Sequence, residues 1–273
     1  MSNVGDFQAR QEKWEPGLIE AILAWIAGLR AAIPIQQIID LLAGRSVVEQ
    51  ILPLLTAPRL ELTPIAADEG RVAVAEVPDR SGIKLSFNMQ DPHFEAAVYT
   101  RGLSAATEID VETKDALRRI VADARAYGHH PNQFAPTIAE TIGLTERQAV
   151  AVHNFANGMI EDGAQPERAL VKADAYAKRL RRQRAMMIAR TETIAAANIG
   201  RMEAFEQAAR NGWVDRNSAR LEWMAVQDDP NEICFHLDGQ RASLDGDFQV
   251  NGVLVGPPPV HPNCRCVLML VTD

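Results

Sequence analysis

The apolar side chains near the N-terminus recur at helical spacing. Over residues 17–30 they return every three or four positions, which predicts a helix with one buried face. Pro34 stands where the first turn of a helix tolerates proline, and this second helix is predicted over 35–43. A third helix is predicted over 46–55, so we expect the chain to begin as a helical module.

The spacing of apolar side chains shortens to every second position later in the same part of the chain. Residues 71–77 and 83–87 alternate apolar and polar side chains, which predicts two strands. The residues between them, 78–82, contain proline, aspartate and glycine and are typical of a turn. We therefore predict that 1–90 forms an N-terminal helical module with a strand pair.

Helical periodicity returns over residues 91–211, which we predict to be a helical middle domain. Separate helices are predicted over 112–127, 133–142 and 145–160. The last of these opens with a capping box, because the side chains of Thr145 and Gln148 can satisfy each other's exposed backbone donors. Pro166 then starts a basic helix, and the sequence leaves open whether Thr191 continues it or begins another.

The pattern changes after Gly212, where short strands and turns are predicted. Strands are expected over 232–237, 248–250, 253–255 and 266–271. Asn251-Gly252 supplies the two positive φ angles of a tight hairpin between the second and third of these strands. We therefore predict a small β-rich region over 212–273. The predicted fold class is α+β, predominantly α-helical with a small β-containing C-terminal region.

Composition excludes several classes of protein. The 273 residues are 47% hydrophobic and 23% charged, which is ordinary for a globular chain. A formal net charge of -8 argues against a globally basic nucleic-acid binder, and three cysteines are too few for a disulfide scaffold. The N-terminus lacks the pattern of a secretory signal, and the most apolar stretch is too short to span a bilayer. We therefore expect synthesis in a cytoplasm and no membrane partner.

Positive charge is concentrated in the predicted basic helix. Residues 166–190 hold eight Lys or Arg against two acids, whereas 191–273 are acidic overall. Such a run usually forms a solvated helix face, but it also suits packaged DNA or an acidic protein, because lysine and arginine release counterions from phosphates. The candidate contact residues are Lys178, Arg179, Arg181, Arg182 and Arg184.

Side chains that can bind a metal gather near the C-terminus. Zinc prefers the sulfur and imidazole ligands that are offered here by Cys234, His236, His261, Cys264 and Cys266. Two residues separate His261 from Cys264, a usual spacing, but only one separates Cys264 from Cys266. In the alternative interpretation, His261 and Asn263 order a turn through backbone hydrogen bonds and the thiols pack as small apolar groups. The sequence leaves both interpretations open.

Enzyme fingerprints do not accompany this cluster. The sequence has no glycine-rich phosphate loop, no Gly-x-Ser-x-Gly elbow and no His-Glu-x-x-His pair, so we predict no catalytic site. One alternative is a zinc-dependent hydrolase-like enzyme that uses zinc-bound water. The other is a DNA-binding module centred on the basic helix.

A charged motif stands where the basic helix meets the acidic C-terminal part. Arg190 and Glu192 flank Thr191 there, and a buried Arg–carboxylate pair would fix this join. Capping of a helix start at the surface is the alternative interpretation. The motif therefore predicts structure rather than chemistry.

Several stretches, taken in order, resemble the C-terminal signature of phage Mu F-like minor head proteins. They are Ala189-Arg-Thr-Glu-Thr193, Leu237-Asp-Gly-Gln240 and Pro259-Val-His-Pro-Asn-Cys-Arg-Cys266, and the resemblance extends over 91–270. It implies a metal set of Cys234, His261, Cys264 and Cys266, and a structural motif of Arg190, Glu192, Asp238, Asn263 and Arg265. His236 falls outside the pattern, and Asn231 stands where the family has a further cysteine.

The resemblance also implies a function. Proteins of this family are structural components of the virion that act in phage head morphogenesis. We therefore expect a protein inside the capsid near the portal, assembled in the host cytoplasm, that aids procapsid assembly, DNA packaging or ejection. The implied partners are the portal protein, the major capsid protein and packaged DNA, with zinc as the candidate cofactor.

Overall fold

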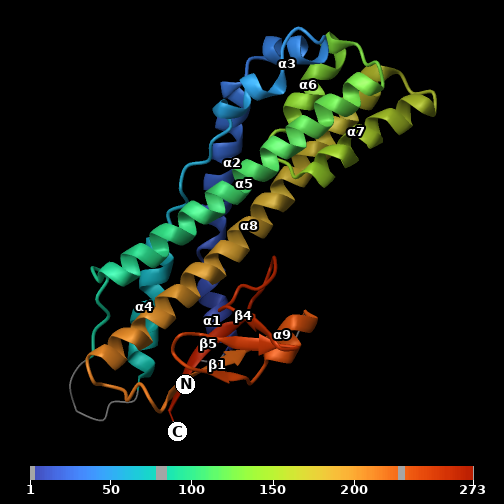
Figure 1. The fold of residues 1–273 in the computed structure, drawn as a ribbon. Helices are drawn as coiled ribbons and strands as arrows, with labels where there is room; N and C mark the ends of the chain where they lie inside the picture. Colours follow the sequence, from blue (N-terminus) through green and yellow to red (C-terminus); the bar gives the residue numbers. More distant parts are fainter. Residues whose placement is uncertain (1–3, 78–84, 227–230, 273) are drawn as a thin grey trace. The chain divides into compact units, whose positions relative to one another are not determined.

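The computed structural model describes residues 4–77, 85–226 and 231–272 (Figure 1). This part of the chain is predominantly helical with a small antiparallel sheet formed after residue 212, which confirms the predicted fold class. The α-helices are α1 (Val4–Gln11), α2 (Glu15–Ala32), α3 (Ile35–Leu42), α4 (Thr63–Glu76), α5 (Pro92–Ala126), α6 (Pro131–Thr141), α7 (Glu146–Glu161), α8 (Pro166–Arg210) and α9 (Glu232–Leu237). The shorter elements are the 3₁₀ turns η1 (Val48–Gln50) and η2 (Leu52–Leu54) and the strands β1 (Ala219–Met224), β2 (Arg241–Ala242), β3 (Phe248–Val250), β4 (Val253–Val255) and β5 (Val267–Thr272).

The elements group into two compact units, each built from separate stretches of the chain. One, here called the mixed unit, comprises Met1–Leu18, Leu60–Leu103 and Met187–Asp273. The other, the helical unit, comprises Ile19–Arg59 and Ser104–Met186. The two units therefore alternate along the chain, whereas the sequence pattern divides it into the consecutive regions 1–90, 91–211 and 212–273.

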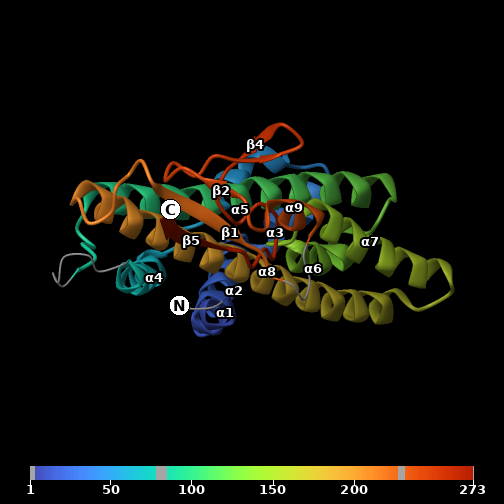
Figure 2. The same ribbon diagram turned by 90° about the horizontal axis from the view of Figure 1, so that it is seen from below.

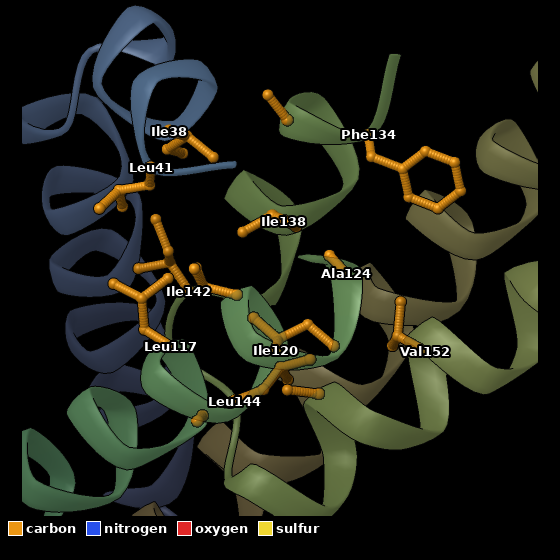
Figure 3. Packing of buried hydrophobic residues seen from close by; sticks show 14 of the residues in the cluster. Ile38, Leu41, Leu117, Ile120, Ala124, Phe134, Ile138, Ile142, Leu144 and Val152 are labelled. Atoms are coloured by element: carbon orange, nitrogen blue, oxygen red, sulfur yellow. The ribbon is translucent and has the colours of Figure 1, made fainter. Parts of the chain in front are cut away.

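The helical unit has an apolar core. Figure 3 shows Ile38 and Leu41 of α3, Ile138 of α6, and Leu117 and Ile120 of α5 within one cluster of buried side chains. All five are almost completely removed from solvent. Burial of this many aliphatic side chains is the main stabilising contribution in the unit, at about 1.5–3 kcal/mol for each fully buried side chain.

Most of the predicted helices are confirmed. Helices α2, α3, α6 and α7 cover the segments that the periodicity indicated. The capping box is present, because Thr145 Oγ1 accepts from the Gln148 N–H at 3.3 Å and Gln148 Oε1 accepts from the Thr145 N–H at 3.2 Å. Helix α8 runs without a break from Pro166 to Arg210, so Thr191 continues the basic helix.

Two helix predictions differ from the structure, one in its length and one in the type of helix. Helix α5 is 35 residues long and begins at Pro92, far before the predicted start at residue 112. The segment 46–55 is not an α-helix but the two 3₁₀ turns η1 and η2. Pro53 explains the second result, because it has no N–H to donate and its ring clashes with the preceding helical turn.

The core of the mixed unit contains an antiparallel sheet in the order β2-β1-β5. Strands β1 and β5 lie side by side in Figures 1 and 2, and Leu221 of β1 faces Leu270 of β5. Ala219, Leu221 and Trp223 alternate with partly exposed residues along β1 and are fully buried. Strand β1 was not predicted from the sequence, although apolar and charged residues alternate along it as in a half-buried strand. Strand β5 was predicted within one residue.

The predicted hairpin is confirmed. Strands β3 and β4 pair antiparallel, with Phe248 opposite Val255. Asn251 and Gly252 have φ angles of 52° and 80°, as a tight turn of this kind requires.

The strand predicted over 71–77 is wrong, because residues 63–76 form helix α4. The alternating valines and alanines also fit a helix, and the buried positions Gly70, Ala73, Val74 and Val77 follow helical spacing. The start of the same helix packs closely against α8, since a Cβ added at Gly200 of α8 would overlap the Ala66 carbonyl oxygen of α4. Of the predicted partner strand 83–87, the described residues 85–87 are irregular, and the predicted turn 78–82 lies outside the described residues.

The strand predicted over 232–237 is also wrong. This segment is the short helix α9, and Asn231 caps it by accepting the Ile233 N–H at 3.1 Å. The cap satisfies one backbone donor that a free helix start leaves exposed. The change from strand to helix matters for function, because it sets the direction of the Cys234 side chain.

Among the described residues, no single helix is both long and apolar enough to cross a membrane. The bent pair formed by Val4–Ala32 and Ile35–Leu42 reaches the required length and composition only when its two parts are taken together.

Candidate functional site

Three consecutive residues of α8 each bind a different element of the mixed unit. Arg190 pairs with Glu15 of α2, with Nε and Oε1 3.2 Å apart. Thr191 Oγ1 accepts the backbone N–H of Asn263 at 3.1 Å. Glu192 forms a two-point ion pair with Arg101 of α5, at 2.6 and 2.8 Å. Successive helical residues point about 100° apart, which explains how one short motif reaches three partners.

A buried Arg–carboxylate pair is present at this join, as predicted, but Arg190 and Glu192 each pair with a residue of another element. The carboxylate of Glu192 is buried and binds Arg101, while Arg190 has its own acidic partner in Glu15. The Thr191–Asn263 hydrogen bond also links the Arg-Thr-Glu motif directly to the His-Pro-Asn-Cys turn. Two motifs that lie 72 residues apart in the sequence thus form one structural feature.

The three cysteines of the chain meet in the interior of the mixed unit. Cys234 lies in the first turn of α9, Cys264 follows the His-Pro-Asn turn, and Cys266 immediately precedes β5. Their sulfur atoms all lie within 4.8 Å of one another, and the Sγ atoms of Cys234 and Cys264 are 3.9 Å apart. All three side chains are buried and none forms a disulfide.

His261 joins this cluster through one ring nitrogen. Its Nε2 lies 3.0 Å from the Cys234 sulfur, and its Nδ1 lies 2.8 Å from the Pro262 carbonyl oxygen. A carbonyl oxygen can only accept, so Nδ1 carries the hydrogen and Nε2 keeps a lone pair directed at the sulfur. His236, by contrast, is exposed and lies in the last turn of α9. The structure therefore brings the three cysteines together and places His261 against one of them, Cys234, while His236 lies apart.

The sulfur cluster is electrostatically polarised. Hydrogen bonds from the Cys234 and Cys266 thiols, together with the backbone N–H groups of Cys266 and Val260, lower the pKa of Cys264 to about 2. Sharing its proton with Cys264 raises the pKa of Cys234 well above its ordinary value. The hydrogen bond with Cys234 lowers the pKa of Cys266. The hydrogen bond with Cys264 and burial have the opposite effect and are stronger together, so the pKa of Cys266 is raised to about 12. The surroundings thus favour the thiolate form at Cys264 over the other two cysteines.

Sequence reasoning missed two polar residues that position this cluster. Asn198 is buried in α8 among alanines, and its Nδ2 donates to the Cys266 carbonyl at 3.0 Å while its Oδ1 accepts the Leu268 N–H at 3.0 Å. Trp223 of β1 is fully buried, and its indole N–H has no oxygen or nitrogen partner among the residues that the structure describes. This N–H lies beside the Cys266 sulfur without good hydrogen-bond geometry, and it helps lower the pKa of that thiol. An asparagine on an alanine-rich helix face was the available sequence signal.

The remaining residues of the predicted structural motif lie in turns of the same unit. Asp238 ends α9, and its Oδ1 accepts the Ala225 N–H at 2.8 Å. Asn263 has a φ of 61°, a left-handed conformation that asparagine tolerates well. Arg265 is exposed and lines a small cavity with Glu15 and Arg190.

The basic helix divides into buried and exposed cations. Arg181 and Arg184 are buried in the helical unit, where Arg181 binds Glu140 and Arg184 binds Glu112 at 2.6 Å. These two guanidinium groups are turned inward, which removes them from the surface set predicted from the sequence. Lys178, Arg179 and Arg182 remain exposed on α8.

Comparison with protein families gives a match over residues 115–269 to the model described as phage Mu protein F like protein. The matched segment is more than half of the chain and contains the Arg-Thr-Glu motif, α9 and the whole Cys/His cluster. It confirms the family that the sequence motifs indicated. No curated protein and no solved structure matches the chain.

Proposed function

The chain belongs to the phage Mu protein F-like family, and on this premise we propose that it is a minor structural protein of a phage head. The match over 115–269 is the observation that carries the proposal, and it supports a role in head morphogenesis. In the detailed form of the proposal, a few copies lie inside the capsid at the portal vertex. They are incorporated during assembly in the host cytoplasm and aid DNA packaging or ejection.

The contacts of the family motifs support a structural role rather than a catalytic one. Arg190, Thr191 and Glu192 use their polar atoms for tertiary contacts within the mixed unit. Hydrogen-bonded ion pairs of this kind fix geometry as well as contributing energy. A motif whose side chains are engaged in this way serves the fold that carries the docking surfaces.

Exposed apolar side chains support docking on a protein partner. Phe235 of α9 is 68% exposed, and Val253 and Leu254 of the β3–β4 hairpin are 65% and 64% exposed. Helix α9 packs against β3, so both elements belong to one side of the mixed unit. Large exposed apolar groups are typical of interaction surfaces. We propose that this surface contacts the portal protein or the major capsid protein.

Mass spectrometry of the phage that encodes this chain tests the location. The chain should be present in mature heads and in procapsids, at far lower copy number than the major capsid protein. A low-symmetry reconstruction of the portal vertex should place it on the inner side of the capsid. Absence from both heads and procapsids would refute the proposal.

Variants at the exposed apolar residues test the docking surface. A phage that lacks the gene is complemented with Phe235→Ser or Leu254→Ser, and with Val171→Ser as the control, because Val171 of α8 is 69% exposed but lies in the helical unit. The first two variants should lower incorporation into procapsids at least tenfold while the isolated protein keeps its thermal stability. Equal incorporation of all three would overturn this surface.

DNA contact is a second candidate function, favoured by one observation. Lys178, Arg179 and Arg182 are exposed within one helical turn of each other on α8. Replacing all three with alanine should weaken DNA binding and flatten its dependence on salt, by about 0.9 of a log–log unit for each phosphate that is no longer neutralised. Wild-type protein that shows no salt-dependent DNA binding would exclude this function.

A further inference from the structure

We propose that Cys234, Cys264, Cys266 and His261 bind one zinc ion in a closed structural site that joins α9 to the start of β5. The proposal goes beyond the role in the phage head and does not depend on it. It rests on where the fold places these four side chains, three of them from the turn before β5 and one from α9.

The distances between the candidate ligand atoms suit a tetrahedral site. With a Zn–S bond of about 2.3 Å, two sulfur ligands of a tetrahedron lie about 3.8 Å apart. The Cys234 and Cys264 sulfurs are 3.9 Å apart, and the third sulfur lies within 4.8 Å of both. The three sulfurs therefore already lie near the separations that one zinc ion requires.

His261 offers the fourth ligand in the correct protonation state. Its Nδ1–H donates to the Pro262 carbonyl, so the lone pair of Nε2 faces the Cys234 sulfur. A histidine that binds zinc usually donates its other ring N–H to a carbonyl or carboxylate in this way. The 3.0 Å between Nε2 and Cys234 Sγ widens to about 3.5 Å when both atoms bind the same zinc ion.

The surroundings of the sulfurs are suited to thiolates. The backbone N–H groups of Val260 and Cys266 point at Cys264, and the indole N–H of Trp223 lies beside Cys266. Three thiolates in a buried space repel one another strongly unless a cation lies between them. A divalent ion with a preference for sulfur resolves this repulsion, and zinc fits three sulfurs and one imidazole.

The four ligands make the site structural. A catalytic zinc site keeps a coordination position open for water or substrate, whereas four protein ligands fill a tetrahedron. A filled tetrahedron opposes the hydrolase interpretation of the same residues. Helix α9 also needs such support, because six residues are too few for a helix that is stable alone. The zinc ion would anchor its first turn at Cys234.

Metal analysis of the full chain tests the proposal. The protein is purified under reducing conditions from cells grown with zinc, and zinc is measured by mass spectrometry. We expect about one zinc ion per chain, because four ligands make one closed site. Titration of the metal-free chain with Co²⁺ should give the visible bands of tetrahedral cobalt and a near-ultraviolet thiolate band.

Matched histidine variants separate the site from general effects of mutation. His261→Ala should lower zinc affinity at least tenfold, whereas His236→Ala, at an exposed histidine of the same unit, should leave it unchanged. Cys264→Ser should abolish stoichiometric zinc. If Cys264→Ser does not fold, the histidine pair and the cobalt spectrum still decide the matter.

Two results would overturn the proposal. One is wild-type protein without zinc or a tetrahedral cobalt spectrum, whose melting temperature a chelator leaves unchanged. The other is a Cys234–Cys264 disulfide in protein isolated with its thiols blocked at lysis. Because every readout uses the isolated chain, failure here leaves the proposed head role intact, and absence from phage heads leaves the zinc site intact.

Discussion

The helical unit and the mixed unit use arginines of the same helix in different ways. In the helical unit, Arg184 of α8 is buried, but its partner Glu112 has a side chain that is 52% exposed. In the mixed unit, Arg201 of α8 is fully buried, and so is its partner Glu69, at 1% exposure. Water can solvate the first pair and cannot reach the second. The mixed unit therefore combines an apolar core of its own with mutual compensation of fully buried charges, whereas the Arg184–Glu112 pair of the helical unit keeps its carboxylate in contact with solvent.

The buried charges of the mixed unit connect four elements. Glu69 of α4 accepts from Arg10 Nε of α1 at 2.5 Å, from Gln11 Nε2 at 2.8 Å, and from Arg201 of α8 at 3.3 Å. Arg201 also binds Glu76 and donates to the Leu268 carbonyl of β5 at 2.8 Å. These elements come from segments far apart in the sequence. The network therefore specifies which segments assemble, whereas the apolar cluster of the helical unit depends less on single partners.

The largest expected difference between the units comes from removing one acid in each. Glu69→Ala removes the fully buried acid partner of Arg201, leaves Glu76 as its remaining acid, and should destabilise the protein by about 3–5 kcal/mol. Glu112→Ala removes a partner that water can replace and should cost about 1 kcal/mol or less. Urea denaturation followed by tryptophan fluorescence and circular dichroism measures both values.

The neighbouring acid Asp68 serves as the control for this pair. Among the residues that the structure describes, its ion-pair partner is the exposed Arg71, 3.5 Å away, so Asp68→Ala should change stability by less than about 0.5 kcal/mol. Equal costs for Glu69→Ala and Glu112→Ala would show that burial of the carboxylate does not distinguish the two units.

Acid should destabilise the helical unit through one buried histidine. His153 of α7 is buried in the helical unit, its Nε2 accepts from Asn157, and burial together with His129 lowers its pKa to about 4. Because this folded-state pKa lies below the ordinary value of 6.5, the neutral form stabilises the fold above pH 6.5. That contribution is lost as the pH falls from 6.5 toward 4, by about 2 kcal/mol after allowance for solvent screening.

Stability measured between pH 7 and pH 4 checks this expectation. His153→Phe should be less stable at pH 7 but should show a shallower decline in acid, whereas His130→Phe should follow the wild type. His130 is the exposed residue that precedes α6. Parallel curves for wild type and His153→Phe would contradict the assignment.

A pair of helical glycines gives a comparison in which the two units should respond with opposite signs. Gly200→Ala in the mixed unit places a Cβ against the Ala66 carbonyl oxygen and should cost about 1–3 kcal/mol. Gly28→Ala in α2 of the helical unit meets no atom within 4 Å and should stabilise by about 0.5–1 kcal/mol. Thermal unfolding of the two variants suffices, and opposite signs are expected. A shared sign would mean that close helix packing at Gly200 is not required.

The sequence predicted the helical unit better than the mixed unit. Most of its helices have regular apolar faces and clear end signals, as in the Thr145–Gln148 capping box, so local information was sufficient for them but not for 46–55. In the mixed unit, two segments that were predicted as strands, 71–77 and 232–237, lie in helices instead. Strand β1 was not predicted at all. The short segments there satisfy more than one periodicity, and contacts with distant parts of the chain select among them.

The candidate site also has residues that the sequence indicated and residues that only the structure revealed. Residue type and order identified Cys234, His261, Cys264 and Cys266, and excluded His236. The sequence did not reveal that Thr191 holds the turn at Asn263, or that Asn198 holds the backbone at Cys266. These are single hydrogen bonds between residues about seventy positions apart, which no local pattern encodes.

By itself the sequence determined the fold class, the helices with regular periodicity, the tight hairpin at Asn251-Gly252 and the family of the chain. Each of these depends on local backbone preferences or on the order of motifs. Only the tertiary structure decided that Arg181, Arg184 and Arg201 point inward and that three sulfurs from two segments meet in one buried cluster. The physical reason is that the energy of a buried charge or thiolate depends on the partners the fold brings to it, and those partners are distant in sequence.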